Sequence, residues 1–173
     1  MIYYIIGQPG AGKTTLSNLL KESLNSEKVI QIDGDDMRVI FDNKDYSENG
    51  RRMNIKKSHD IATFLNAKNY DVIISLVSPF KDIREEFKLN NSNVVEIFVH
   101  TDSIRGREDF FVKNYEYPTD NYIDLDTSNT DDITMKKLLN KIEELNKIVY
   151  NNHDLAWLFV FFWEVIFLYI NKN

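Results

Sequence analysis

The segment that most constrains this chain is GQPGAGKT at residues 7–14, which fits the pattern G-x-x-x-x-G-K-[ST] without a gap. A short run of β-forming residues at 1–6 precedes it, and leucines at helical spacing over 13–24 follow it. Three of the chain's six glycines lie in this segment, where they let the backbone turn tightly and point successive N–H groups at an anion. An ordinary glycine turn between a strand and a helix is the alternative, and the concentration of glycine argues against it.

This segment predicts a site for the phosphates of a nucleoside triphosphate. The N-terminus of the following helix adds a partial positive charge. We expect Lys13 to reach the β- and γ-phosphates as a catalytic cation, and the Thr14 hydroxyl to bind Mg²⁺. The predicted cofactors are therefore ATP and Mg²⁺, and the residues expected to hold them are Gly7, Gly10, Ala11, Gly12, Lys13, Thr14 and Thr15. The pattern specifies the nucleotide and leaves the reaction open.

Apolar runs alternate with segments of helical periodicity along the rest of the chain. Strands are expected at 1–6, 29–32, 70–77, 94–100 and 122–125, and helices at 13–24, 51–67, 81–88 and 131–150. Residues 104–113 fit either a short helix or a mobile loop. Strands that alternate with helices indicate a parallel sheet covered on both faces. The predicted fold is therefore α/β, a three-layer α/β/α phosphate-loop fold whose sheet is mostly parallel and has about five strands.

Composition narrows the classes of function. The formal charge is −6, from 21 Lys and Arg against 27 Asp and Glu, which argues against a broad basic surface for long nucleic acid but not against a local anion pocket. The chain has no cysteine, so disulfides, thiolate zinc sites and cysteine nucleophiles are excluded. The apolar run at 1–6 is too short for a secretory signal and has no basic region before it, so we expect a cytoplasmic location.

A cluster of charged residues follows the second predicted strand, where the sequence is DGDDMR at residues 33–38. The carboxyl ends of parallel strands face the ligand crevice in such a sheet, so Asp33 and Asp35 are expected near the phosphates. A carboxylate there can hold a Mg²⁺-bound water or accept the proton of an attacking hydroxyl. A solvated acidic turn that caps the next helix is an equally weighted alternative for this segment taken alone.

The segment DGDDMR resembles the D-G-D-N-[IV]-R segment of the adenylylsulfate kinase family. In the family's order follow YSENGRRMNIKK at 46–57, similar to F-S-x-x-D-R-x-E-N-I-R-R, and SLVSPF at 75–80 with Arg84, similar to I-S-P-Y…R. YEYP at 115–118 and LDT at 125–127 resemble the family's Y-E-x-P and L-D-T. The resemblance runs from about residue 2 to residue 127 and depends on this ordered set rather than on any one segment.

The resemblance implies transfer of the γ-phosphoryl group of ATP to the 3′-hydroxyl of adenosine 5′-phosphosulfate (APS), which gives PAPS in sulfate activation. It implies that Asp35 is the carboxylate nearest that hydroxyl, either as a catalytic base or as an organiser of Mg²⁺ together with Thr14. The residues implied to contact the acceptor are Asp33, Arg38, Tyr46, Arg51, Asn54 and Ser78. Tyr46 stands where the family has an aromatic residue that stacks on the adenine. An anionic acceptor also suits arginine forks, and this chain uses arginine sparingly, with 6 against 15 lysines.

The clearest departure from the family lies at 101–114, where the family has a long lid with a second adenine-stacking aromatic residue. Arg105 and Arg107 are the natural cations of this shorter lid, expected to neutralise charge in the transition state, and a solvated loop is the alternative. The missing aromatic residue would have to be replaced by one of Phe110, Phe111 and Tyr115.

These departures keep two other functions open. One is a kinase of another small hydroxyl acceptor, such as a nucleoside, a nucleotide or a polynucleotide end. The other is a nucleotide-binding interaction protein without acceptor turnover. For a kinase, the expected partner is a small-molecule substrate and not long nucleic acid, and a homo-oligomer is compatible with the sequence.

The last part of the chain is of a different kind. Residues 155–170 are apolar on every face of a helix, with Glu164 as the single charge. At ~1.5 Å per residue such a helix would be about 24 Å long, shorter than the ~30 Å hydrocarbon core of a membrane. Docking on the preceding domain or on another chain is favoured, while insertion into a membrane surface and an appended segment stay open. We therefore predict a phosphate-loop kinase domain at 1–148 and an apolar, aromatic-rich tail at 149–173.

Overall fold

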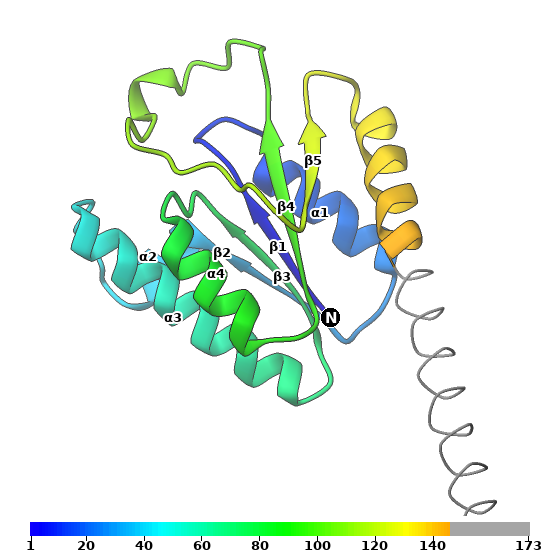
Figure 1. Ribbon diagram of the computed structural model, residues 1–173, viewed down its shortest axis with the longest axis horizontal. Coiled ribbons are helices and arrows are strands. Elements are labelled where there is room, and N and C mark those ends of the chain that lie inside the picture. The colour runs from blue at the N-terminus through cyan, green and yellow to red at the C-terminus, as the bar shows by residue number, and fades with distance from the viewer. Residues whose placement is uncertain (146–173) are drawn as a thin grey trace, which may run out of the picture. The chain divides into compact units, whose positions relative to one another are not determined.

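The computed structural model describes residues 1–145, so the tail predicted at 149–173 and the boundary predicted at 148 lie outside the described residues. The chain divides into two compact units, Met1–Met135 and Lys136–Asn173. The first unit contains a five-stranded sheet in the order β2-β3-β1-β4-β5, in which every neighbouring pair is parallel (Figure 1). The predicted α/β fold with a parallel sheet of five strands is therefore confirmed. Within residues 1–145, no helix combines the length and the apolarity needed to cross a membrane.

The elements follow one another as strand and helix, as the alternating sequence pattern predicts. In chain order they are β1 (Ile2–Ile6), α1 (Lys13–Leu24), β2 (Val29–Asp33), α2 (Gly34–Ile40), α3 (Glu48–Ala67), β3 (Asp71–Leu76), α4 (Lys81–Asn90), β4 (Val94–His100), the short 3₁₀ helix η1 (Glu108–Phe110) and β5 (Tyr122–Asp126). A further helix covers residues 131–145.

Strand β1 is the centre of the sheet and is buried over its whole length. It pairs with β3 on one side and with β4 on the other, so every residue of β1 has a neighbour in both directions. Successive side chains in a strand point to opposite faces, so a strand covered on both faces needs apolar residues at every position. The sequence IYYII meets this requirement, and it places the glycine-rich loop directly after the most buried strand.

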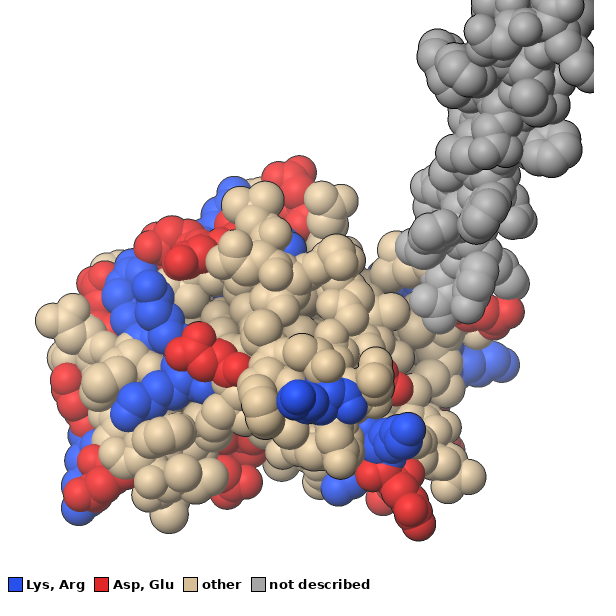
Figure 2. Space-filling view, turned by 90° about the horizontal axis from the view of Figure 1, so that it is seen from below, with Lys and Arg blue, Asp and Glu red and all other residues tan. Residues whose placement is uncertain are grey.

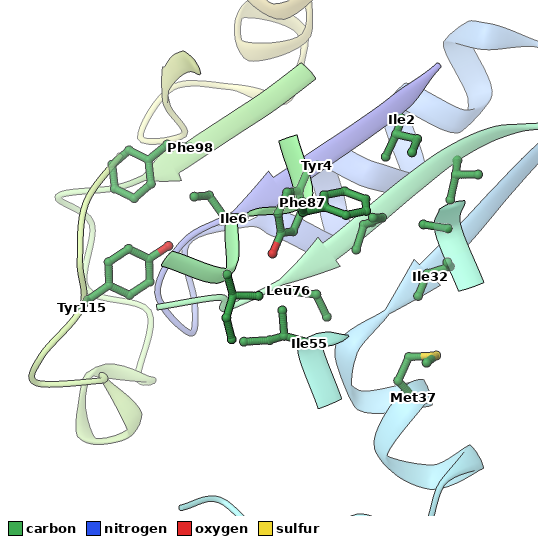
Figure 3. Close-up of a cluster of buried hydrophobic side chains, with 14 residues drawn as sticks. Ile2, Tyr4, Ile6, Ile32, Met37, Ile55, Leu76, Phe87, Phe98 and Tyr115 are labelled. Atoms are coloured by element: carbon green, nitrogen blue, oxygen red, sulfur yellow. The ribbon is translucent and has the colours of Figure 1, made fainter. Parts of the chain in front are cut away.

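The two faces of the sheet have separate apolar cores. Figure 3 shows the first, in which Ile2, Tyr4 and Ile6 of β1 pack with Ile55 of α3 and Phe87 of α4. Helices α3 and α4 lie on this side of the sheet and α1 lies on the other (Figure 1). The buried residues of α1 include two leucines. With both faces covered, the edge of the sheet where the strands end remains for a ligand.

Helices α2 and α3 each begin at a side-chain cap, which the apolar pattern of the sequence does not reveal. Helix α3 begins three residues before the predicted residue 51, because the Ser47 side chain accepts a hydrogen bond from the N–H of Gly50. Helix α2 was not predicted as a helix, and it begins after Asp33, whose carboxylate accepts from the N–H of Asp35. The acidic turn after β2 is thus a helix cap, and it lies at the ligand edge as well.

Figure 2 shows the molecule from the side opposite the carboxyl ends of the strands. Basic and acidic residues are interspersed on this face among uncharged residues, and Lys and Arg do not gather there into one patch. This distribution agrees with the acidic net charge of −6. The cationic groups that gather in one place are those at the other end of the sheet, described next.

Candidate active site

The phosphate loop joins β1 to α1 and is shaped by backbone conformations that favour glycine. Gly10 has a φ of 80° and Gly12 a φ of 88°, both in the left-handed region. Lys13 folds back over the loop, where its Nζ donates to the main-chain oxygen of Gln8 at 2.8 Å. Burial lowers the pKa of Lys13 to about 8, against the opposing effect of Asp33 and Asp35. A partly buried ammonium beside a glycine-rich turn that opens a helix is a ready anion site.

Thr14 and Asp33 bring two oxygen ligands together beside this loop. The Thr14 hydroxyl donates to Oδ2 of Asp33 at 3.1 Å, while Oδ1 of Asp33 caps α2. Mg²⁺ in nucleotide sites is bound by one or two such oxygens together with phosphates, so this pair fits that ion. Asp35, predicted as a metal ligand together with Thr14, lies in the first turn of α2 and lines the same cleft. Among residues 1–145, no group of three or more His, Asp or Glu side chains forms a metal site of its own.

Arg38, Tyr46 and Arg51 form a compact cluster on the acceptor side. The guanidinium of Arg38 lies 4.0 Å from the centre of the Tyr46 ring, and that of Arg51 lies 5.6 Å from it. Arg38 also donates to the main-chain oxygens of Asn43 and Asp45, at 3.1 and 2.8 Å, and Arg51 donates to that of Tyr46 at 2.9 Å. Burial and the nearby charge of Arg38 lower the pKa of Arg51. The cluster is thus held by main-chain oxygens, which do not neutralise its charge.

Asn54 and Ser78 line the same side but have their polar atoms partly engaged by the protein. The Asn54 amide donates to the main-chain oxygen of Gly34 at 3.1 Å, and within residues 1–145 its buried Oδ1 has no hydrogen-bond partner. The Ser78 hydroxyl is hydrogen-bonded to the hydroxyl of Tyr4 in the core, and Ser78 has a positive φ of 41°. The strained turn after β3 therefore forms a fixed wall of the site.

The short lid lies over the phosphate loop. Arg105 donates to the main-chain oxygens of Gly10 and Thr127, at 3.2 and 2.6 Å. A Cβ added at Gly10 would lie 2.9 Å from Cβ of Arg107, so the lid and the loop leave no space between them there. Phe110 and Phe111 line the cleft, as two of the three aromatic residues considered for this position. The third, Tyr115, is excluded because it is buried in the core beside Phe98.

One cleft of about 1010 Å³ connects the phosphate loop, the acceptor cluster and the lid. The predicted site residues that line it are Gly10, Gly12, Lys13, Thr14, Thr15, Asp33, Asp35, Arg38, Tyr46, Arg51, Asn54, Ser78, Arg105 and Arg107. Gly7 and Ala11 do not line it, and Ala11 is buried. The cleft is also lined by residues that were not predicted as site residues, although all but Asp109 belong to the quoted motifs: Pro9, Gly34, Ile55, Ser75, Leu76, Val77, Pro79 and Asp109. Several of these directly follow a strand, which is the signal that could have identified them.

The cleft is lined by four arginines and Lys13, against the three aspartates Asp33, Asp35 and Asp109. Within residues 1–145, no carboxylate lies within 4.0 Å of the guanidinium groups of Arg38, Arg51, Arg105 and Arg107. By contrast Arg52, the neighbour of Arg51, pairs with Glu48 and Asp82 at 2.8 Å and lies outside the cleft. Arginines that lack a carboxylate partner in a cleft favour a ligand with several phosphate-like groups.

Comparison with known proteins agrees with this geometry. The family model described as adenylylsulphate kinase matches residues 1–109. The adenylyl-sulfate kinase of Burkholderia ambifaria is 34% identical over 104 residues, which are 57% of this chain and 57% of that protein. The cytidine diphosphoramidate kinase of Campylobacter jejuni is 29% identical over 131 residues, 72% of this chain and 77% of that protein. The chain therefore spans little more than half the length of the adenylyl-sulfate kinases that it matches first.

Solved structures share the fold. The APS kinase CysC of Mycobacterium tuberculosis, in complex with AMPPNP and APS, superposes with a TM-score of 0.67 at 17% identity, covering 82% of this chain and 96% of that one. Shikimate kinase from Aquifex aeolicus superposes with a TM-score of 0.56 at 17% identity, covering 84% of this chain and 98% of that one. At such identities the likeness establishes the phosphate-loop kinase fold alone. The match over residues 1–109 goes further, and by it the chain belongs to the adenylylsulphate kinase family.

Proposed function

We propose that this chain is an ATP-dependent kinase that transfers the γ-phosphoryl group to a hydroxyl of a second, anionic nucleotide. APS, with its 3′-hydroxyl, is the first acceptor to consider because of the family, and PAPS would be the product. The observation that carries the proposal is the continuous cleft that holds both the phosphate loop and the cluster of Arg38, Tyr46 and Arg51. One end suits the triphosphate of ATP, and the other suits the anionic group and the base of an acceptor.

The donor side follows from the loop. The N–H groups of Gly12, Lys13 and Thr14 and the ammonium of Lys13 bind the β- and γ-phosphates of ATP. Thr14 and Asp33 are the residues that would hold Mg²⁺, which when bound neutralises charge between the phosphates. Arg107 is the lid cation that completes the neutralisation, while Arg105 holds the lid to the loop through two main-chain oxygens.

The transfer step needs an oriented hydroxyl and a proton acceptor. The acceptor oxygen forms a bond to the γ-phosphorus while the bond from that phosphorus to the bridging oxygen breaks, and ADP leaves. Asp35 accepts the proton of the hydroxyl and keeps the oxygen directed at the phosphorus. Arg38 and Arg51 bind the anionic group of the acceptor, and the ring of Tyr46 offers a face to its base.

The experiment is ADP release from Mg-ATP with and without APS, together with identification of the product. We expect stimulation by APS that is lost on the order of a hundred-fold or more in Asp35→Asn, because the amide cannot take the proton. Asp36→Asn is the matched control, since Asp36 is the next residue of α2 and does not line the cleft. ATP binding without any stimulation by APS would reject APS as the acceptor.

A cytidine nucleotide is the second candidate acceptor. The similarity to the Campylobacter cytidine diphosphoramidate kinase extends over 131 residues, whereas that to the Burkholderia adenylyl-sulfate kinase extends over 104. The match to the Campylobacter protein covers a larger part of both chains, which favours testing cytidine diphosphoramidate beside APS. The same assay with cytidine diphosphoramidate decides between them by the ratio of kcat/KM values. ATP binding with neither acceptor turned over would favour the nucleotide-binding interaction protein.

A further inference from the structure

The side chain of Gln8 connects the phosphate loop to the lid. Its Nε2 donates to the main-chain oxygen of Val112 at 3.0 Å, and its Oε1 accepts from the N–H of Val112 at 3.0 Å. The amide therefore pairs with both main-chain groups of one residue, as a neighbouring strand would. Gln8 occupies a position that the phosphate-binding pattern leaves unspecified, so phosphate binding by itself does not explain a glutamine there.

The main chain of the same residue contacts the catalytic lysine. The oxygen of Gln8 accepts from Nζ of Lys13 at 2.8 Å and from the N–H of Ala11 at 3.1 Å. Gln8 is thus in direct contact with the group that binds the transferred phosphate and with the C-terminal end of the lid.

Within the lid at 101–114, the stretch 105–112 is anchored at both ends. At its start, Arg105 binds the oxygens of Gly10 and Thr127, and its own N–H donates to the Glu108 carboxylate at 2.8 Å. At its end, Val112 is held by Gln8 and packs against the apolar core. The residues between these anchors include the two aromatic rings that line the cleft.

Phe110 and Phe111 depend on these anchors for their position. Phe110 is 62% exposed and Phe111 is 45% exposed, so neither is fixed by burial in the core. Their N–H groups donate to the oxygens of Arg107 and Glu108, at 3.0 and 3.1 Å, within the turn of η1. An aromatic surface that is held in place before a ligand arrives loses less entropy when a base stacks on it.

We propose that Gln8 is a positioning residue that, through Val112, holds Phe110 and Phe111 at the cleft as a preformed surface for the base of a nucleotide. Occupancy of the phosphate loop and binding of the base are then coupled through one side chain. The kinetic consequence rests on the proposed kinase function, whereas the placement of the lid by Gln8 does not.

The first test measures the lid directly and needs no acceptor. Trypsin cleaves after Arg105, Arg107 and Lys113, all of which lie in the lid. Gln8→Met keeps the length of the side chain and removes both hydrogen bonds, so we expect cleavage in the lid to be about ten-fold faster. Gln31→Met is the matched control, because Gln31 also donates two side-chain hydrogen bonds, to Ser17 and Asn18, but away from the lid.

Two outcomes of this test decide whether Gln8 holds the lid in place. Faster cleavage at these sites in Gln8→Met, with Gln31→Met at the wild-type rate, supports it. Lid cleavage at the wild-type rate in a folded Gln8→Met protein overturns it. Gln8→Glu serves as a second variant should Gln8→Met fail to fold, because it keeps the acceptor for the Val112 N–H and loses the donor. Lid cleavage faster than in the wild type supports the placement of the lid by Gln8, and cleavage at the wild-type rate overturns it.

The second test separates the base surface from the chemistry. In Gln8→Met we expect the KM of a nucleotide to rise about ten-fold while kcat changes less, because Lys13 and Asp35 are untouched. An unchanged KM for both ATP and the acceptor, in a variant whose lid is loosened, overturns the coupling. If no acceptor is turned over by the wild-type chain, the proposed function fails, and the cleavage result still stands on its own.

Discussion

The guanidinium of Arg84 and the carboxylate of Glu96 form an ion pair of 2.8 Å in which both side chains are completely buried. Arg84 also donates to the main-chain oxygens of Ser78 and Glu116, at 2.8 and 2.6 Å, and Glu96 accepts from Lys88. The pair therefore joins α4 and β4 to the strained turn at Ser78 that forms a wall of the cleft. Its satisfied hydrogen bonds offset the cost of burying two charges.

Removal of one partner from this pair is expected to destabilise the fold. Arg84→Met would leave Glu96 with Lys88 alone and would release the oxygen of Ser78, at a cost of about 3–5 kcal/mol of unfolding free energy. Urea denaturation measures this, and the double variant Arg84→Met/Glu96→Leu should recover part of the loss because no buried charge then lacks its partner. A cost below about 1 kcal/mol for the single variant would show that the pair contributes little.

The pKa of Lys13 predicts how ATP binding depends on pH. Burial lowers this pKa to about 8, and a bound phosphate would raise it again, so binding should take up a proton near pH 8. Above that value the free lysine is neutral, and the affinity for ATP should fall by up to about ten-fold per pH unit. Calorimetry in two buffers of different ionisation enthalpy measures the proton uptake. Lys13→Met should bind weakly and without this dependence, and a flat affinity between pH 7 and 9 in the wild type would contradict the prediction.

The guanidinium groups of Arg38 and Arg51 beside Tyr46 are expected to supply much of the affinity for the acceptor. Arg51→Met and Arg38→Met should each raise the KM of the acceptor about 10- to 100-fold, because each removes a charge-assisted contact to an anion. Arg52→Met is the matched control, since Arg52 pairs with Glu48 and Asp82 outside the cleft. Steady-state kinetics at saturating ATP measures the effect. Equal changes in Arg51→Met and Arg52→Met would mean that the charge of the cluster does not select the acceptor.

The lowered pKa of the buried His59 predicts that the fold loses stability in acid. It stacks on Phe87 at 3.9 Å and is 6% exposed, and burial, with a smaller effect of Lys56, lowers its pKa to about 3. The unfolded chain binds a proton at His59 below about pH 6.5, whereas the folded chain does not until much lower pH, so stability falls as the pH falls from 6.5 towards 3. At pH 5 this amounts to about 2 kcal/mol. The difference in unfolding free energy between pH 7 and pH 5 should shrink by that amount in His59→Leu, and an unchanged difference would contradict the prediction.

Local sequence patterns were sufficient to predict the sheet and the phosphate loop. The loop follows an uninterrupted apolar strand, and its glycines can be recognised without any knowledge of distant contacts. The carboxyl ends of the strands then bring Asp33, Asp35 and the turn at Ser78 to one edge, so parallel pairing alone assembles much of the cleft.

What the sequence did not reveal depends on contacts between distant residues. Tyr115 and Phe111 are both aromatic and four residues apart, yet one is buried beside Phe98 and the other lines the cleft. The apolar spacing of the helix expected at 131–150 predicts five inward positions, namely Ile133, Leu138, Leu139, Ile142 and Leu145. Leu138 and Ile142 are buried, whereas the other three are at least 40% exposed. The bond between Gln8 and Val112 joins residues that no periodicity relates.

The central place of β1 in the sheet also sets an order of events during synthesis. Ile2 pairs with Val72 on one side and with Val94 on the other, so β1 gains both neighbours only after β3 and β4 have left the ribosome. Contacts between residues so far apart in the chain form slowly and late. Until β4 has emerged, the apolar strand IYYII has an unpaired edge and is a hazard for aggregation. The strand that leads into the phosphate loop is therefore paired on both sides only after β4 is available, about eighty residues later in the chain than the loop itself.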